Sequence, residues 1–373
     1  MRILQVSSAR SFGGGERHLA DLSNALAQRG HDVYAALAPS SPLFTELSDL
    51  PSQNIESVPL RNALDLRAAL KLARMAREHR AEIIHAHLAR DYPLAALAVK
   101  KSKGARLVLT RHLEYPLNRL HMMTLSSVSR VIAVSKAVER ALRAQKIFAA
   151  RKIRLVSNGI DVERFESIGR GFNREAYRRS LPTRARLLVG ITGELREHKG
   201  QEDLVRAAAL IKREFVDVDF LIVGDDASPD KRYRAHLERL IKELGLEGRV
   251  HLLGWLADVA PFLHAIDLFV SSSRIEPFGL AIVEAMACGA AVVATATGGA
   301  QEIIENGVTG KLVPVNNSEA LAEALRTLLK DRHERARLSE RARMAARERF
   351  SLERMVDATE KVYMEALNAL SRK

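Results

Sequence analysis

Residues 271–289 read SSSRIEPFGLAIVEAMACG and place a helix directly after an apolar strand. We expect this helix to begin near Pro277, because proline at the first helical position leaves no N–H unpaired, and to be capped by Gly289. A helix N-terminus reached from a strand end offers free backbone N–H groups and a partial positive charge, which suit a phosphate or sugar hydroxyls. The amides expected to bind such a ligand are those of Phe278, Gly279 and Leu280.

Two glutamates accompany this helix. Glu276 precedes it, and Glu284 lies about two turns further along. Carboxylates suit vicinal hydroxyls, because both oxygens accept hydrogen bonds and the diol donates two. Taken alone, the pair is also compatible with surface carboxylates, but its apolar, glycine-flanked setting favours a binding site.

On both sides of this stretch, short apolar runs alternate with helical patterns. The first half has runs at 3–6, 33–37, 83–85, 107–109 and 131–134, and the second at 187–191, 220–223, 250–253 and 268–270. This alternation predicts a parallel sheet covered by helices in each half. The predicted fold class is α/β, with two Rossmann-like domains facing across a cleft.

The domain boundary is expected where the apolar rhythm stops. Residues 167–183 carry glycines, arginines and a proline, as an interdomain connection does. The predicted division is an acceptor-side domain at 1–170, a linker at 171–184, a nucleotide-sugar domain at 185–348 and a terminal helix at 349–373.

Further motifs give the chain a family resemblance. Glu276 and Glu284, with seven residues between them, resemble the signature of glycosyltransferase family 4, and the resemblance covers almost the whole chain. The other matching motifs are Gly13-Gly14-Gly15-Glu16-Arg17, Val131-Ile132-Ala133-Val134-Ser135, Asn158-Gly159-Ile160-Asp161, Lys199-Gly200, Thr297-Gly298-Gly299 and Asn306-Gly307-Val308-Thr309-Gly310. The resemblance implies the GT-B fold, retention of anomeric configuration, no metal or other cofactor, and a terminal helix that returns to the N-terminal domain.

The resemblance also implies roles for residues of the second half. Glu284 should bind the donor ribose, Glu276 the transferred sugar and Lys199 the diphosphate. The family usually has an arginine directly after the glycine at 193, whereas this chain has Glu194. Arg196 is the nearest basic residue that can assist Lys199 as charge builds on the leaving oxygen.

The first half contributes a glycine loop and two histidines. Gly14 and Gly15 allow a sharp turn and a close approach of the backbone to a ligand before a helix begins, and the pattern G-x-G-x-x-G is absent. The resemblance implies that this loop binds the donor phosphates or lies at the entrance for the acceptor. The resemblance implies that His112, at the end of a strand, touches the transferred sugar. His87, at the end of another strand, is the candidate for the acceptor side.

Composition bounds the compartment and the partners. Cys288 is the only cysteine, which excludes a disulfide framework and a cysteine-based zinc cluster. The first residues lack the apolar core of a signal peptide, so a cytoplasmic protein is expected. The net charge of +13 is concentrated in the first half, which suits contact with the anionic inner membrane face, although a solvated face without a partner is an equal alternative.

The combined prediction is a retaining hexosyltransferase that moves a sugar from a nucleotide-sugar to a glycan or lipid-linked acceptor of the cell envelope. One alternative is a nucleotide-sugar epimerase of the same fold, which would act on the donor alone. The other is a basic nucleic-acid-binding protein, which the 5% aromatic content and the lack of an aromatic-rich basic motif disfavour. No nucleic-acid partner is therefore expected.

Overall fold

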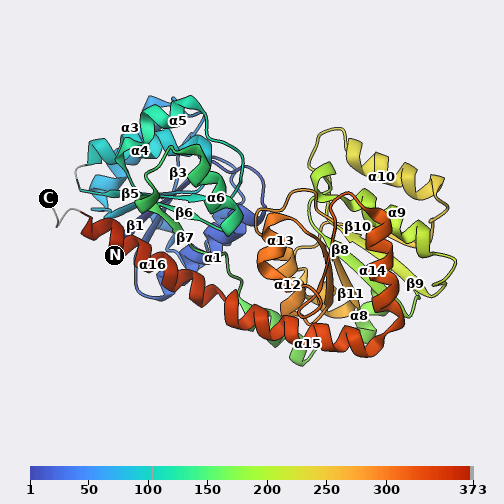
Figure 1. Cartoon of the computed structure of the whole chain (residues 1–373). Helices are drawn as coiled ribbons and strands as arrows, with labels where there is room; N and C mark the ends of the chain where they lie inside the picture. Colours follow the sequence, from blue (N-terminus) through green and yellow to red (C-terminus); the bar gives the residue numbers. More distant parts are fainter. Residues whose placement is uncertain (103, 370–373) are drawn as a thin grey trace. The chain divides into compact units, whose positions relative to one another are not determined.

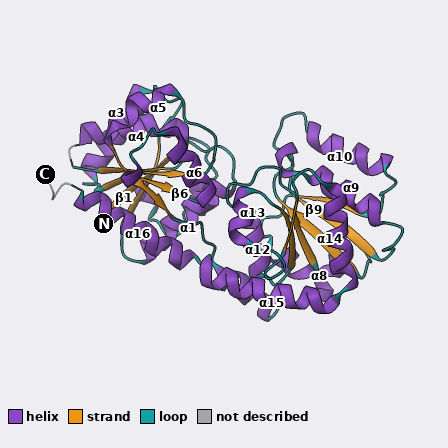
Figure 2. Cartoon of the chain, viewed as in Figure 1, coloured by secondary structure: helices purple, strands orange, loops and turns teal. Residues whose placement is uncertain are grey.

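The computed structural model describes residues 1–102 and 104–369 (Figure 1). The chain forms two compact units. The first contains residues 1–159 together with the terminal segment from Leu352, and the second contains Ile160–Ser351. In each unit the strands lie between layers of helices (Figure 2). Among the described residues, no helix is both long enough and apolar enough to cross a membrane.

The first unit is built on a seven-stranded parallel sheet with the order β3-β2-β1-β4-β5-β6-β7. Its strands are β1 (Arg2–Ser7), β2 (Asp32–Leu37), β3 (Ile55–Ser57), β4 (Ile83–Ala86), β5 (Arg106–Arg111), β6 (Val128–Ala133) and β7 (Ile153–Leu155). The strand order changes direction between β1 and β4. In an open parallel sheet, ligands bind beyond the carboxyl ends of the strands at such a switch point.

The helices of the first unit are α1 (Gly14–Gln28), α2 (Leu43–Glu46), α3 (Leu66–Glu78), α4 (Tyr92–Ser102), α5 (Arg119–Thr124), α6 (Lys136–Gln145) and α16 (Leu352–Asn368), with short 3-10 turns at Ser52–Asn54, Ala89–Asp91, Leu125–Ser127 and Ala150–Lys152. Polar residues start several of them. Asp65 accepts a hydrogen bond from the N–H of Ala68, and Ser135 accepts one from Val138, which satisfies N–H groups that have no acceptor inside the helix.

The terminal helix α16 packs on the first unit, against α1, β5 and β6 (Figure 1). Its buried residues Met355, Val356 and Tyr363 join the same apolar core as Leu22 and Leu26 of α1. The expected helix over 349–373 is therefore observed from Leu352 to Asn368, and its last positions, 370–373, lie outside the described residues.

The second unit has a six-stranded parallel sheet with the order β10-β9-β8-β11-β12-β13. Its strands are β8 (Leu187–Thr192), β9 (Val218–Val223), β10 (Val250–Gly254), β11 (Leu268–Ser271), β12 (Ala291–Thr295) and β13 (Lys311–Val313). The switch point lies between β8 and β11. Two parallel-sheet α/β units confirm the predicted fold class.

The helices of the second unit are α7 (Val162–Arg170), α8 (Arg174–Ser180), α9 (Gln201–Ile211), α10 (Arg232–Glu243), α11 (Ala260–Ala265), α12 (Leu280–Ala287), α13 (Gly298–Ile303), α14 (Ser318–Lys330) and α15 (Arg332–Arg349), with a 3-10 turn at Glu197–Lys199. These helices bury the apolar faces that the spacing of their residues predicts. Leu204, Ala208 and Ile211 of α9, for example, are buried against the sheet.

The expected linker at 171–184 is not a separate connection. It contains α8, which belongs to the second unit. Arg178 donates to the carbonyl of Ala265 and to the carboxylate of Asp267, and Arg174 donates to the same carboxylate. Because charged side chains hold this helix in place, its sequence lacks the apolar rhythm by which a packed helix is recognised.

Candidate active site

The predicted residues of the second unit lie at its switch point. The loop after β8 carries Arg196 and Lys199, and the loop after β11 carries Glu276 and leads into α12. Lys199 donates from Nζ to Oε2 of Glu276 at 2.7 Å, and both side chains are more than two-thirds buried. The hydroxyl of Ser273 lies 3.4 Å from the same carboxylate oxygen. Lys199, predicted to bind the diphosphate, and Glu276, predicted to bind the transferred sugar, therefore form an ion pair with each other.

The two loops are locked to each other by a close backbone approach. Gly200 has a φ of 65°, and a Cβ there would overlap the carbonyl oxygen of Ser272. The hydroxyl of Ser272 in turn donates to the carbonyl of Gly200 at 2.7 Å. Only glycine allows both the left-handed conformation and this contact, which explains the Lys199-Gly200 motif in structural terms.

The start of α12 is fixed in a similar way. Gly279 has a φ of 114° and precedes the helix, which begins at Leu280 and not near Pro277 as expected, because a residue in that conformation cannot be helical. Phe278 is buried and packs edge-on against Phe350 with ring centroids 5.8 Å apart. The N–H of Gly299 donates to the carbonyl of Glu276 at 2.9 Å. The amides at the helix start are thus held on a rigid loop.

Glu284 and Arg196 complete the predicted set of the second unit. Glu284 lies half-buried on α12. Arg196 is more than half exposed, and its Nε lies 2.7 Å from Oε1 of Glu194. The glutamate that replaces the family's usual arginine is therefore neutralised by Arg196. His198 lies beside them, and its pKa is lowered first by burial and then by the charges of Lys199 and Arg196.

In the first unit, the glycine loop lies against a histidine. Gly13 precedes α1, whose first residues are Gly14 and Gly15. A Cβ on Gly15 would lie 3.7 Å from the ring of His112, so the backbone of this loop passes directly over the imidazole. The structure thus brings together Gly14, Gly15 and His112, which the sequence placed at two different strand ends.

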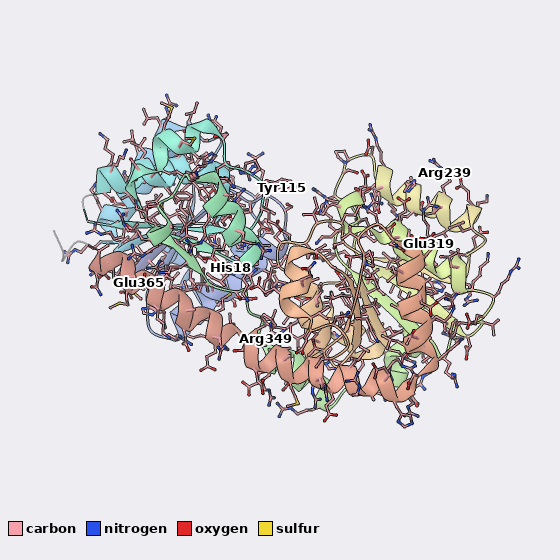
Figure 3. The ribbon with its side chains drawn as sticks, viewed as in Figure 1. His18, Tyr115, Arg239, Glu319, Arg349 and Glu365 are labelled. Atoms are coloured by element: carbon pink, nitrogen blue, oxygen red, sulfur yellow. The ribbon has the colours of Figure 1, made fainter. Side chains whose placement is uncertain are left out.

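His87 joins the same group, together with a histidine that the sequence analysis missed. His18 of α1, which is labelled in Figure 3, is buried. Its ring centroid lies 4.9 Å from that of His112 and 5.7 Å from that of His87. Burial lowers the pKa of His18 to about 4 and the pKa values of His87 and His112 well below the usual range. The only sequence signal for His18 is its place on the buried face of α1, four residues before Leu22, where a core histidine is the ordinary interpretation.

A buried acid was also missed. Asp91, in the 3-10 turn after β4, accepts a hydrogen bond from the N–H of Ser8 at 2.8 Å. Arg90 donates to the hydroxyl and the carbonyl of the same serine. Burial raises the pKa of Asp91 to about 6, although the hydrogen bonds from Ser8 oppose this shift. Arg90 and Asp91 fix the start of the loop that leads from β1 to the glycines.

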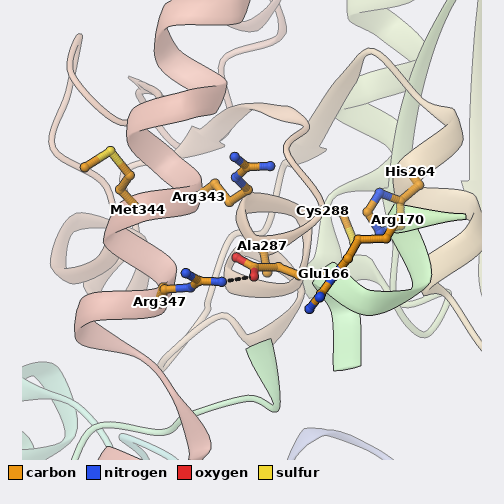
Figure 4. A pocket seen from close by; sticks show the side chains of 9 residues that line it. Glu166, Arg170, His264, Ala287, Cys288, Arg343, Met344 and Arg347 are labelled. Carbon is orange, nitrogen blue, oxygen red and sulfur yellow. Dashed lines mark hydrogen bonds and ion pairs between the residues drawn. The ribbon is translucent and has the colours of Figure 1, made fainter. Parts of the chain in front are cut away.

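A pocket of about 530 Å³ lies elsewhere on the second unit, between α7, the C-terminal end of α12 and α15 (Figure 4). Its walls include Arg170, Arg343 and Arg347, the last in an ion pair with Glu166. Cys288 also lines it, and burial raises the pKa of this thiol, which agrees with a packing role. None of the predicted site residues is among the residues that line this pocket.

Two family descriptions match the sequence. Residues 12–164 match Glycosyltransferase Family 4, and residues 173–345 match Glycosyl transferases group 1. The lipopolysaccharide core biosynthesis glycosyltransferase LpsE of Rhizobium meliloti (strain 1021) is 30% identical over 93% of this chain and 94% of its own length. The N-acetyl-alpha-D-glucosaminyl L-malate synthase of Bacillus anthracis is 29% identical over 96% of this chain and 95% of its own.

A solved structure agrees over nearly the whole chain. The Anabaena protein Alr3699/HepE in complex with UDP superimposes with a TM-score of 0.85 at 27% identity, covering 98% of this chain and 100% of that one. The same Anabaena protein has also been solved in complex with UDP-glucose. The likeness therefore extends over both units.

Proposed function

The chain belongs to the glycosyl transferases group 1 of glycosyltransferase family 4, and from this premise we propose that it moves a hexose from a UDP-sugar to a glycan or lipid-linked acceptor in lipopolysaccharide synthesis. It is a glycosyltransferase, and the proposed reaction retains the anomeric configuration. A UDP-sugar is proposed because HepE has been solved with UDP and with UDP-glucose. The acceptor is proposed because LpsE is named for lipopolysaccharide core biosynthesis.

The observation that carries this proposal is the ion pair of Lys199 and Glu276 beside the start of α12. As the bond between the anomeric carbon and the diphosphate oxygen breaks, negative charge builds on that oxygen. A fixed ammonium and the free N–H groups of a helix N-terminus stabilise this charge where it develops. Lys199 and the amides of Phe278, Gly279 and Leu280 supply both.

The carboxylates act on hydroxyls. Glu276 holds hydroxyls of the transferred sugar, and Glu284 holds the ribose diol, since a carboxylate accepts two hydrogen bonds from a diol. Arg196, which is paired with Glu194 in this structure, turns toward the diphosphate in the proposed reaction and assists Lys199 as a second cation. In the front-face reaction that we propose, the acceptor oxygen attacks the anomeric carbon, and its proton passes to the leaving diphosphate.

The first unit is proposed to serve the sugar and the acceptor. His112 orients the transferred sugar, Gly14 and Gly15 allow the backbone to approach the donor, and His87 lies on the acceptor side. The rings of both histidines are held neutral by burial, which lets them exchange hydrogen bonds with hydroxyl groups.

We also propose that the first unit touches an anionic membrane. The first half of the sequence carries the net positive charge. It also has exposed apolar side chains, among them Tyr115 before α5 and Met122 and Met123 on α5, and Met123 is 80% exposed. Cationic residues with exposed apolar neighbours suit an anionic headgroup layer. Sedimentation with vesicles that contain anionic lipid should retain the protein at low salt, and Met122→Ser with Met123→Ser should weaken retention. Equal binding to purely zwitterionic vesicles would contradict an electrostatic contact.

A donor screen tests the main proposal. The melting temperature should rise with UDP and UDP-sugars more than with GDP, ADP or dTDP analogues, because a ligand that binds only the folded state stabilises it. Glu284→Ala should remove the UDP-dependent rise, whereas Glu340→Ala, an exposed glutamate on α15, should keep it. A folded protein that responds to none of these nucleotides would overturn the proposed donor site. Consumption of donor without acceptor, giving an epimer, would favour the epimerase alternative.

A further inference from the structure

The cavity shown in Figure 4 lies apart from the predicted site residues. It has a volume of about 530 Å³ and is bounded by α7, by His264 of α11, by the end of α12 and by α15. All of its lining residues belong to the second unit, so this unit alone defines its shape. Its volume falls within the range of about 300–1,000 Å³ that is typical of small-molecule sites. The cavity is therefore large enough to hold an organic ligand.

Positive charge dominates the walls of this cavity. Three arginines line it, Arg170 at the end of α7 and Arg343 and Arg347 on α15, against one glutamate, Glu166. Arg347 is neutralised by its ion pair with Glu166. The other two arginines have no hydrogen-bond or ion-pair partner for their side chains among residues 1–102 and 104–369. Because like charges that share a cavity repel each other, an anion between these two arginines is stabilised by both.

The arrangement of the arginines suits a phosphate group. Arg343 and Arg347 are four residues apart, so their side chains leave the same face of α15, whereas Arg170 comes from another helix. A guanidinium presents paired N–H groups that match two oxygens of a phosphate, and such charge-assisted pairs are stronger than neutral ones. A terminal phosphate carries three oxygens and a charge of about −2. It therefore matches two guanidinium groups better than a carboxylate does.

The remaining walls suit the body of a hydroxylated molecule. Met344 and Ala287 supply apolar surface. His264 donates from Nε2 to the carbonyl of Phe165 at 2.8 Å, which leaves Nδ1 of the neutral ring able to accept from a hydroxyl. Gly169 lets α7 pass directly against this ring, because a Cβ there would lie 2.5 Å from Cε1 of the imidazole. The helix and the ring thus hold each other in place at the cavity wall.

Two features of the cavity oppose an anion. One is the carboxylate of Glu166, whose charge Arg347 already balances. The other is the end of α12, where carbonyl oxygens carry a partial negative charge. The carbonyls of Ala285 and Met286 accept hydrogen bonds from the backbone that follows the helix, each at 3.0 Å, so they are satisfied within the chain. Neither feature cancels the charge of the two arginines without partners.

We propose that this cavity binds a phosphorylated small molecule, a phosphate ester with a hydroxylated body such as a sugar phosphate. The phosphate lies between Arg170 and Arg343, and the body covers Met344 and reaches His264. The cavity adjoins the end of α12, whereas the proposed donor site adjoins its start. The inference thus goes beyond the proposed sugar transfer, and binding here is measured without donor or acceptor.

Calorimetric titration of the full chain with mannose 6-phosphate tests this site, with mannose as the uncharged control. We expect saturable binding of the phosphate ester and none of mannose. Arg170→Gln and Arg343→Gln should each weaken binding at least about tenfold, because each removes a charge-assisted hydrogen bond. Arg341→Gln, an exposed arginine of α15 that does not line the cavity, should bind like the parent. Circular dichroism checks that each variant is folded.

Glu166→Gln is a test that a loss of folding cannot imitate, because it predicts a gain. The substitution removes the opposing carboxylate and releases Arg347. We expect the affinity for mannose 6-phosphate to rise at least about threefold. Glu284→Ala should leave this affinity unchanged, since it alters only the proposed donor site.

The proposal is overturned if the parent protein binds neither compound, or binds mannose as tightly as its phosphate ester. It is equally overturned if folded Arg170→Gln and Arg343→Gln bind like the parent, or if Glu166→Gln binds no more tightly. Loss of binding in Glu284→Ala would place the ligand in the donor site and would also refute it. A failed response to UDP, with the binding of mannose 6-phosphate intact, would refute only the proposed donor site.

Discussion

Lys199 and Glu276 neutralise each other across 2.7 Å at the carboxyl ends of β8 and β11. The carboxylate is the more buried partner, with 15% of its side chain exposed. In the proposed reaction, the ammonium turns from this carboxylate toward the diphosphate as charge develops there. The pair therefore holds the cation in place before the donor binds and releases it when a stronger anion arrives.

Lys199→Met tests that arrangement, because methionine keeps the length of the side chain and removes the charge. We expect kcat to fall about 100- to 1,000-fold, as when one stabiliser of a developing negative charge is removed. Steady-state kinetics with the donor found by the screen measure this. Lys361→Met, on the exposed face of α16, is the control. A kcat within threefold of the parent value would exclude Lys199 from diphosphate stabilisation.

Gly299→Ala tests the rigidity of the loop before α12. A Cβ there would overlap the carbonyl of Phe278, and backbone cannot move aside cheaply. We expect a loss of about 1–3 kcal/mol in the free energy of unfolding and a drop of about 10- to 100-fold in kcat/KM for the donor. Gly171→Ala is the matched control, since a Cβ there meets nothing within 4 Å. Equal melting temperatures for the two variants would show that the loop is not fixed by this contact.

Much of the fold could be predicted because strands and helices differ in period and length. The run at 187–191 is observed as β8, and the run at 268–270 as β11. β12 was missed because Ala291–Thr295 follows α12 within a nearly continuous apolar stretch, where neither period is visible. α8 was missed because its arginines, and not apolar residues, attach it to Asp267.

The site residues could be predicted where they follow strands that are neighbours in the sheet. The resemblance to family 4 is confirmed, and Lys199 and Glu276 meet because neighbouring parallel strands end at the same sheet edge. His18 could not be found in this way, since on α1 it occupies a core position. Its approach to residues 87 and 112 depends on how α1 packs over the sheet, and no spacing in the sequence encodes that.

Asp91→Asn tests the pH dependence of stability. The folded-state pKa of Asp91, about 6, lies above its unfolded value of about 3.8. Between these two values the folded protein holds a proton that the unfolded chain releases. The stability that this proton contributes is complete below pH 3.8 and is lost as the pH rises through 6. Asparagine stays neutral and still accepts from Ser8. We therefore expect the difference in melting temperature, variant minus parent, to be larger at pH 7.5 than at pH 4. The same difference at both pH values would refute the raised pKa of Asp91.

Tyr363→Phe tests how α16 is held to the first unit. The hydroxyl of Tyr363 lies 2.7 Å from Nδ1 of His85, whose Nε2 is already engaged by Thr110 at 2.7 Å. Both Tyr363 and His85 are fully buried, so no water replaces the lost hydroxyl, and Nδ1 is left unpaired. We expect the free energy of unfolding in urea to fall by about 1–3 kcal/mol, against less than about 0.5 kcal/mol for the exposed Tyr115→Phe. If the two variants lose equal stability, the buried hydrogen bond adds nothing, and the helix is attached by its apolar contacts and by ion pairs such as that of Arg154 with Glu365.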